Sequence, residues 1–348
     1  EYRELFLGYI KDHVKSEINL VIYNEIGDDD KELIKEYFPS CKFKKMEHHR
    51  SHAASGYFQS GFDKAIVLSI DGGGFDYDGV TYTKSFVANG NEVKSLQKYD
   101  INLGVAYGHI GQPISEIKPG LDSSAHSLVY AGKVMGLCAY GDVIDDWLEP
   151  MRRYYEHKHL SKLGQEIGLN LSLDSLSGQQ SYDLAATSQV VFEEKAFELL
   201  SPLISEYDEY DVVLVGGCAL NVLFNQKLYE QLDKMGRKLY VPPNPNDCGL
   251  SLGQFLLEYP QKAEDIQYNG FELLDQDLLE TYIKDNNARK IEISEIVKLL
   301  KNGKLIGLVG GCSEVGPRAL GNRSIICDPS FPDMKDILNS KVKFREWY

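Results

Sequence analysis

The segment 48–74 constrains the fold of this chain more than any other stretch. His48 and His52 are four residues apart, so on a helix both imidazoles lie on one face, with about 5–6 Å between their Cβ atoms. The run 64–70 has the length and apolar character of a strand, and it ends at Asp71 and three glycines. The sequence therefore predicts a helix followed by a buried strand, which is the start of an α/β unit.

The same segment carries candidate metal ligands. Two imidazoles at this spacing suit two nitrogen ligands of one divalent ion. Asp71 adds a carboxylate, and a carboxylate beside a glycine turn is a usual way to bring a phosphate and its metal together. The alternative is that His48 and His52 are ordinary core or surface residues. The Asp-Gly-Gly-Gly sequence so soon after them favours the metal site.

Composition limits the classes of function. A chain of 348 residues exceeds what a single core usually fills, so we expect two or more domains. The net charge of −15 argues against a general nucleic-acid or membrane-surface binder, and no stretch approaches the ~20 apolar residues of a membrane span. The six cysteines form no CxxC pair and no signal peptide is visible, which indicates a reducing, cytoplasmic compartment.

Helices and strands alternate along the whole chain, as is typical of α/β proteins. Residues 260–270 look like a linker. The expected elements are a strand over 18–23, a helix over 30–37, a β-hairpin over 80–100 turning at Asn89-Gly90, a helix over 183–206, a strand over 211–215, a helix over 221–232, helices over 272–285 and 293–301, and a strand over 305–309.

Gly216 and Gly217 follow a buried strand and precede a helix. Paired glycines let a backbone approach a nucleotide closely, and helix N-terminal amides favour anions. The alternative is an ordinary tight turn, which is the stronger interpretation of the glycine pair alone. The glycine-ended strands at 71 and 216 are candidates for equivalent points of a duplicated unit. We expect both turns to face one cleft, because ligands of α/β folds bind outside such strand ends.

Two further motifs are candidates for binding sites. The proline-rich turn 242–247 delivers Asp247 to a helix start, where simple N-capping is the alternative. The segment 314–324 holds Arg318 and Arg323 in a loop shaped by glycine and proline, and both offer planar charged forks for phosphate or carboxylate. The alternative is a solvated charged loop, but the composition favours an anion site. We expect Arg318 to belong to a different domain and site from the metal motifs, because the linker separates them.

Together these motifs resemble those of the NodU/CmcH-type O-carbamoyltransferases, the family that includes tobramycin carbamoyltransferase. The resemblance implies an actin/sugar-kinase/heat-shock-like, duplicated ribonuclease-H-like α/β ATPase core over 1–262. It also implies the start of a YrdC-like α/β domain over 263–348. The matching stretches, in family order, are 48–61, 71–74, 132–141, 216–228, 242–253 and 316–329.

The resemblance also implies roles for individual residues. The metal would be Fe²⁺ by resemblance, although ligand chemistry alone also suits Mn²⁺ or Zn²⁺. Its ligands would be His48, His52, Asp71 and Asp247. The nucleotide would be lined by Gly72, Gly73, Gly74, Lys133, Gly216, Gly217 and Asn221. Arg318, together with Arg323, would bind carbamoyl phosphate or the carbamoyl-adenylate intermediate.

The implied activity is ATP-dependent transfer of a carbamoyl group from carbamoyl phosphate, through carbamoyl-adenylate, to a hydroxyl of a sugar or natural product. A sugar-kinase-like phosphotransferase would leave the His48/His52 pair and the 316–329 motif without a role. A third alternative is an inactive nucleotide-binding homologue. The family opens with a strand and a His-Asp-Ser-Ser-like loop that we do not find, and it continues past residue 348, so we expect a piece of a longer protein. Cys312 stands where the family has arginine, and Val315 replaces a phenylalanine. We expect the loss of that arginine to weaken or alter anion binding.

Overall fold

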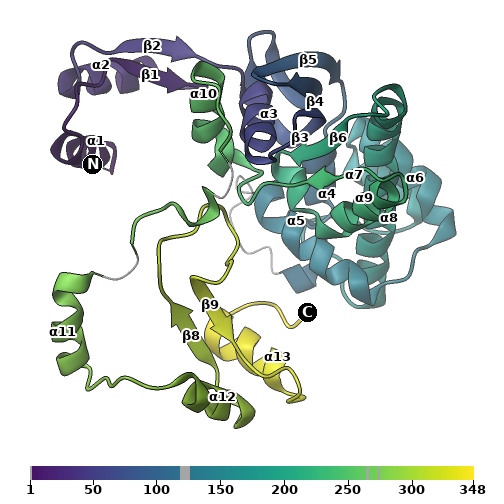
Figure 1. The fold of residues 1–348 in the computed structure, drawn as a ribbon. Coiled ribbons are helices and arrows are strands. Elements are labelled where there is room, and N and C mark those ends of the chain that lie inside the picture. Colours follow the sequence, from purple (N-terminus) through teal and green to yellow (C-terminus); the bar gives the residue numbers. More distant parts are fainter. Residues whose placement is uncertain (1, 118–125, 264–265, 273–274) are drawn as a thin grey trace.

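The computed structural model describes residues 2–117, 126–263, 266–272 and 275–348, and a five-stranded mixed sheet lies within its largest unit (Figure 1). The strands lie in the order β5-β4-β3-β6-β7. Their bounds are β3 (Lys64–Asp76), β4 (Gly79–Asn89), β5 (Glu92–Tyr99), β6 (Asp211–Val215) and β7 (Leu239–Tyr240).

The directions of these strands identify the type of unit. Strands β3, β4 and β5 are antiparallel neighbours, whereas β6 runs parallel to β3 and β7 runs parallel to β6. Three antiparallel strands followed by two that run parallel to the first is the arrangement of a ribonuclease-H-like unit. The predicted α/β class is therefore confirmed, and so is the hairpin that turns at Asn89-Gly90.

Helices cover both faces of the sheet because strand β3 is apolar on both. Ile66, Leu68 and Ile70 point into one core, and Ala65 and Val67 point into the other, all fully buried. The smaller core is covered by α3 (His48–Gln59) and α10 (Leu250–Glu258). The larger core is covered by α4 (Leu103–His109), α5 (His126–Leu137), α6 (Asp145–His157), α7 (Leu160–Ile167), α8 (Gln179–Glu206) and α9 (Val222–Lys234).

Glycines hold α3 tightly between α10 and the sheet. A Cβ at Gly253 of α10 would lie 1.8 Å from the carbonyl oxygen of Ser51. A Cβ at Gly56 of α3 would lie 2.4 Å from Cγ1 of Val215 in β6. Neither position has room for a Cβ, so the two glycines let α3 lie close to the backbone of α10 on one side and to the valines of β6 on the other.

The two ends of the chain form smaller units (Figure 1). At the start, a parallel two-stranded sheet lies beside α10, and its strand β2 was not predicted. That unit contains α1 (Tyr2–His13), β1 (Leu20–Tyr23), α2 (Asp28–Tyr37) and β2 (Lys42–Lys45). The other contains α11 (Gln276–Asp285), α12 (Ile293–Lys301), β8 (Ile306–Val309), β9 (Arg323–Ile326) and α13 (Met334–Ile337), with β8 and β9 antiparallel.

Two sequence-based expectations about this frame need correction or stay open. Strands β3 and β6 are neighbours in one sheet, so the glycines at 71–74 and 216 are not equivalent points of two copies. The boundary after residue 262 and the YrdC-like assignment stay predictions; residues 264–265 of the expected linker and 273–274 of the expected helix lie outside the described residues. Of the helices described, none has the length and apolarity needed to cross a membrane.

Candidate metal centre

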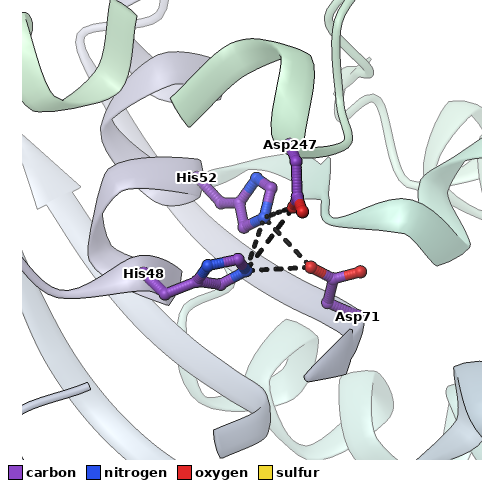
Figure 2. A group of neighbouring side chains, drawn as sticks. All are labelled: His48, His52, Asp71 and Asp247. Atoms are coloured by element: carbon purple, nitrogen blue, oxygen red, sulfur yellow. Dashed lines mark hydrogen bonds and ion pairs between the residues drawn. The ribbon is translucent and has the colours of Figure 1, made fainter. Parts of the chain in front are cut away.

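Four side chains from three distant parts of the chain point at one another (Figure 2). His48 and His52 extend from α3, Asp71 from β3, and Asp247 from the turn before α10. His48 Nε2 lies 2.9 Å from Asp71 Oδ2 and 3.1 Å from His52 Nε2. His52 Nε2 lies 3.2 Å from Asp71 Oδ2 and 3.3 Å from Asp247 Oδ1. All four donor atoms lie within 4.8 Å of one another, so the predicted ligands do converge.

The cluster is built to hold positive charge. Two unprotonated ring nitrogens cannot share a hydrogen bond, so the 3.1 Å approach of His48 Nε2 and His52 Nε2 needs a proton or a cation among them. Burial alone would lower the pKa of His52, but hydrogen bonds to Asp247 and Asp71 outweigh burial and raise its pKa to about 9. Burial opposes ionisation of Asp71 as well, yet hydrogen bonds with His48 and His52 hold its pKa well below the ordinary value.

The donor set fits a divalent transition metal. Two imidazole nitrogens and two carboxylate oxygens suit Fe²⁺, Mn²⁺ or Zn²⁺, so the chemistry does not select iron. The side chains of His48, His52 and Asp71 are 5%, 0% and 8% exposed, whereas that of Asp247 is 67% exposed. The centre is therefore closed by protein on three sides and open on the side of Asp247.

Asp71 lies in a bulge rather than at a strand end. Strand β3 continues to Asp76, and its register with β4 shifts between Ile70 and Gly74. Within this bulge Asp71 Oδ1 accepts hydrogen bonds from the backbone N–H of Gly72 at 2.8 Å and of Gly217 at 3.1 Å. One carboxylate oxygen is thus fixed by backbone donors, and the other is left for the histidines.

The paired glycines lie directly against this bulge. A Cβ at Gly217 would lie 2.9 Å from Asp71 Oδ1, and Gly216, with φ +88°, would place a Cβ 2.2 Å from the carbonyl oxygen of Ile70. The two glycine segments therefore touch rather than face each other across an open cleft. Their first role is to position Asp71, and contact with a nucleotide stays a prediction.

His49 is a residue of this centre that the sequence analysis missed. Its ring is fully buried, with Nδ1 2.8 Å from Ser69 Oγ and Nε2 2.9 Å from the carbonyl oxygen of Thr81. Burial lowers its pKa to about 4, so the ring is neutral. Because a carbonyl only accepts, Nε2 donates to Thr81 and Nδ1 accepts from the Ser69 hydroxyl. His49 thus ties α3 to β3 two residues before Asp71.

A second cluster of acidic side chains, which includes Glu47 and Asp76, is already paired with a lysine. The ammonium of Lys84 lies 3.1 Å from Asp76 Oδ2 and 3.2 Å from Glu47 Oε1. Asp76 Oδ1 also accepts the backbone N–H of His49 at 3.1 Å. This group therefore fixes the start of α3, and Lys84 fills the place that a second ion would take.

Two residues predicted to line the nucleotide have partners within the protein. Asn221 caps α9 by accepting the N–H of Phe224 at 3.1 Å, and its amide exchanges two hydrogen bonds with Gln189 at 3.0 and 3.1 Å. Lys133 lies 2.5 Å from Glu346 and donates to the carbonyl of Ile117 at 3.2 Å. A nucleotide role for either residue stays a prediction and would need exchange of these partners.

The two arginines that were predicted to bind anions differ in their contacts within the protein. Arg323 donates to Glu314 at 3.1 Å and to the carbonyl of Gly316 at 2.8 Å, so it holds the loop together. The guanidinium of Arg318 is exposed and makes no hydrogen bond or ion pair within the described part of the chain. The loop that carries it rests on the 242–247 turn, because Gly316 lies against Pro243. The two motifs are thus in contact, whatever the domain boundary.

Comparison with known proteins assigns the family. Residues 15–256 match the family model described as carbamoyltransferase N-terminus, and residues 297–348 match carbamoyltransferase C-terminus. The chain belongs to the carbamoyltransferase family. The predicted resemblance is therefore confirmed, and the four converging residues all lie within the N-terminal carbamoyltransferase match.

Several curated proteins are similar to this chain over most of its length. Nodulation protein NolO of Bradyrhizobium diazoefficiens is 29% identical over 87% of this chain and 57% of its own length. Nodulation protein NolNO of Sinorhizobium fredii is 31% identical over 87% of this chain and 46% of its own. Uncharacterized protein MJ1051 of Methanocaldococcus jannaschii is 31% identical over 100% of this chain and 69% of its own. The chain spans about half to two-thirds of the length of these relatives.

Among solved structures, full-length HypF in the phosphate- and nucleotide-bound form aligns with a TM-score of 0.42 and 19% identity. The alignment covers 74% of this carbamoyltransferase-family chain and 49% of HypF.

Proposed function

We propose that this chain is the metal-bearing part of an ATP-dependent O-carbamoyltransferase that acts on a hydroxyl of a sugar or natural product. The observation that carries the proposal is the convergence of His48, His52, Asp71 and Asp247 beside the Gly217 turn, in a chain of the carbamoyltransferase family. A sugar-kinase-like phosphotransferase would use the Asp71 bulge but leave the histidine pair without a role.

The four residues would hold one divalent ion, with Fe²⁺ favoured and Mn²⁺ or Zn²⁺ as alternatives. When bound, such an ion supplies positive charge that neutralises phosphate oxygens and orients the adenylate. The residues themselves limit access. Because three ligands are buried and Asp247 is exposed, a substrate phosphate would approach along the Asp247 side. Gly72, next to Asp71 in the chain, borders open space, since a Cβ at this position would meet no atom within 4 Å.

Arg318 would act in the earlier step. Its exposed guanidinium offers two parallel N–H donors to a phosphate or carbamate. Water would cleave carbamoyl phosphate there to carbamate and inorganic phosphate. A carbamate oxygen would then bond to the α-phosphorus of ATP, giving carbamoyl-adenylate as pyrophosphate leaves. At the metal centre the acceptor hydroxyl oxygen would then bond to the carbamoyl carbon and lose its proton, and AMP would leave. Passage of the adenylate directly between the two sites of a divided enzyme would protect it from water.

The test is carbamoyl-phosphate-dependent release of pyrophosphate from ATP by the full-length protein. We expect Arg318→Ala to abolish this release and to leave transfer from supplied carbamoyl-adenylate largely intact. Arg318→Lys should rescue poorly, because a point charge does not reproduce the planar fork. Arg289→Ala is the matched control, since Arg289 is an exposed arginine paired with Glu295 on the surface.

Other outcomes would support other functions. Phosphorylation of a sugar without carbamoyl phosphate would indicate a kinase, and no turnover under either condition would indicate an inactive homologue. If Arg318→Ala keeps adenylate formation and loses only transfer, the proposed division of labour is wrong.

A further inference from the structure

Asp247 is the least supported ligand of the metal centre. Its side chain is 67% exposed, and among the described residues its carboxylate forms ion pairs with His48 and His52 alone. Asp71, by contrast, is held by two backbone N–H groups. The position of the Asp247 carboxylate therefore depends on the backbone of the turn 242–247 that carries it.

That turn is held from two sides. On one side, the N–H of Gly216, just after β6, donates to the carbonyl of Pro245 at 2.7 Å, and Gln59 at the end of α3 donates to Asn244 Oδ1 at 3.1 Å. On the other side lies the arginine loop, where a Cβ at Gly316 would be 2.0 Å from the carbonyl oxygen of Pro243. The loop and the turn are thus in backbone contact, and a methyl group does not fit between them.

The arginine loop has little freedom to retreat from this contact. The buried carboxylate of Glu314 accepts N–H groups from Leu320 at 2.8 Å and Asn322 at 2.6 Å. The N–H of Val315 donates to the carbonyl of Gln267 at 2.9 Å. Hydrogen bonds thus hold the loop on both sides of Gly316. A side chain added at Gly316 would therefore displace the 242–247 turn rather than the loop.

We infer that Gly316 is a positioning residue for the metal centre. Through Pro243 it sets the position of Asp247, so the loop that carries Arg318 tunes the affinity of the His48/His52/Asp71/Asp247 cluster for a divalent ion. The inference rests on the proposed metal role of that cluster. By linkage, a ligand that shifts the loop changes metal affinity, and metal binding changes the affinity of that ligand by the same factor.

Two alanine substitutions separate this contact from general strain in the loop. Gly316 has φ +97° and meets Pro243, whereas Gly321 in the same loop has φ +128° and meets no atom within 4 Å. Both substitutions strain the backbone, but only Gly316→Ala pushes the turn. The readout is titration of the full chain with Co²⁺ alone, followed by its visible absorption.

We expect Gly316→Ala to weaken Co²⁺ binding about 10–100-fold, the range for lost outer support of a metal ligand, and Gly321→Ala to leave it at the wild-type value. Equal Co²⁺ affinity in Gly316→Ala and wild type, or equal weakening by both substitutions, overturns the inference. A wild-type chain that binds no Co²⁺ instead overturns the proposed metal site itself.

Hydrogen exchange on the wild-type chain keeps the inference testable if Gly316→Ala does not fold. Addition of Co²⁺ should slow exchange in peptides covering 242–249 and also in those covering 312–323. Protection confined to 242–249 and to the histidine helix would show that the loop does not sense the metal centre, and the inference would fail.

Discussion

Gly74 lies directly against the imidazole of His48: a Cβ at Gly74 would be 2.1 Å from His48 Cγ. The last glycine of the Asp-Gly-Gly-Gly motif thus makes room for the ring of a candidate metal ligand, and its contact with a nucleotide stays a prediction. Gly72, two residues earlier, would place a Cβ in open space. Glycines of one motif therefore serve different purposes.

This difference gives the first prediction. Gly74→Ala should displace the His48 ring and weaken Co²⁺ binding by about 10–100-fold, whereas Gly72→Ala should leave Co²⁺ affinity unchanged. Titration followed by visible absorption measures both. Unchanged affinity in Gly74→Ala would mean that the ring is not fixed by this contact.

The second prediction concerns His49. His49→Phe keeps the ring volume but leaves the Ser69 hydroxyl and the Thr81 carbonyl without their buried partner. Each orphaned group costs about 1–3 kcal/mol, so the free energy of unfolding should fall by at least about 2 kcal/mol. Urea unfolding measures this, with His159→Phe on the surface as the control. Equal stability of the two variants would rule out an anchoring role for His49.

The third prediction compares two helical glycines. Gly253→Ala should push α10 away from α3 and lower the free energy of unfolding by about 1–3 kcal/mol, because the backbone of Ser51 cannot yield. Gly132→Ala, at an exposed and open position of α5, should raise it by up to about 1 kcal/mol. Thermal unfolding of both variants checks the opposite signs, and a shared sign would contradict the packing argument.

The fourth prediction is a pH dependence of the arginine loop. Burial alone would raise the pKa of Glu314, but hydrogen bonds from Asn322, Leu320 and Arg323 outweigh it and hold the pKa below the ordinary 4.5. A lowered folded-state pKa stabilises the fold above the ordinary pKa, and this contribution is lost as pH falls through the folded value.

The stability difference between wild type and Glu314→Gln should accordingly be full at about pH 6 and shrink below about pH 4.5. Urea unfolding across this range measures it, with Glu32→Gln on the surface of α2 as the control. A difference that stays constant with pH would show that the Glu314 charge does not stabilise the loop.

Local signals in the sequence pointed to each of the four converging residues, and the family resemblance joined Asp247 to the other three. The i, i+4 spacing marks His48 and His52, the end of an apolar run marks Asp71, and a proline-rich turn marks Asp247. Their convergence follows from the packing of α3 and α10 against the sheet beside the bulge that carries Asp71.

Features that depend on contacts between distant segments of the chain could not be predicted from these local signals. The bulge at Asp71 arises from the register of β3 with β4, which no single segment encodes. The partners of His49 are 20 and 32 residues away, and Gly316 meets a carbonyl of the distant residue Pro243. Sequence spacing gives no information on contacts of this kind, whereas the helix and strand periods do show in sequence.

The ligands of the metal centre come from segments far apart in sequence, and this has a consequence for folding. An unfolded chain keeps only the His48/His52 pair close together, and Asp247 joins it once α10 has docked on α3. An ion held by all four residues would bind the folded chain far more tightly than the unfolded one. At a free-ion concentration about 100 times the dissociation constant, such preference adds about 2.7 kcal/mol to the free energy of unfolding. The supply of metal would then set how much of the chain stays folded, as well as how much of it is active.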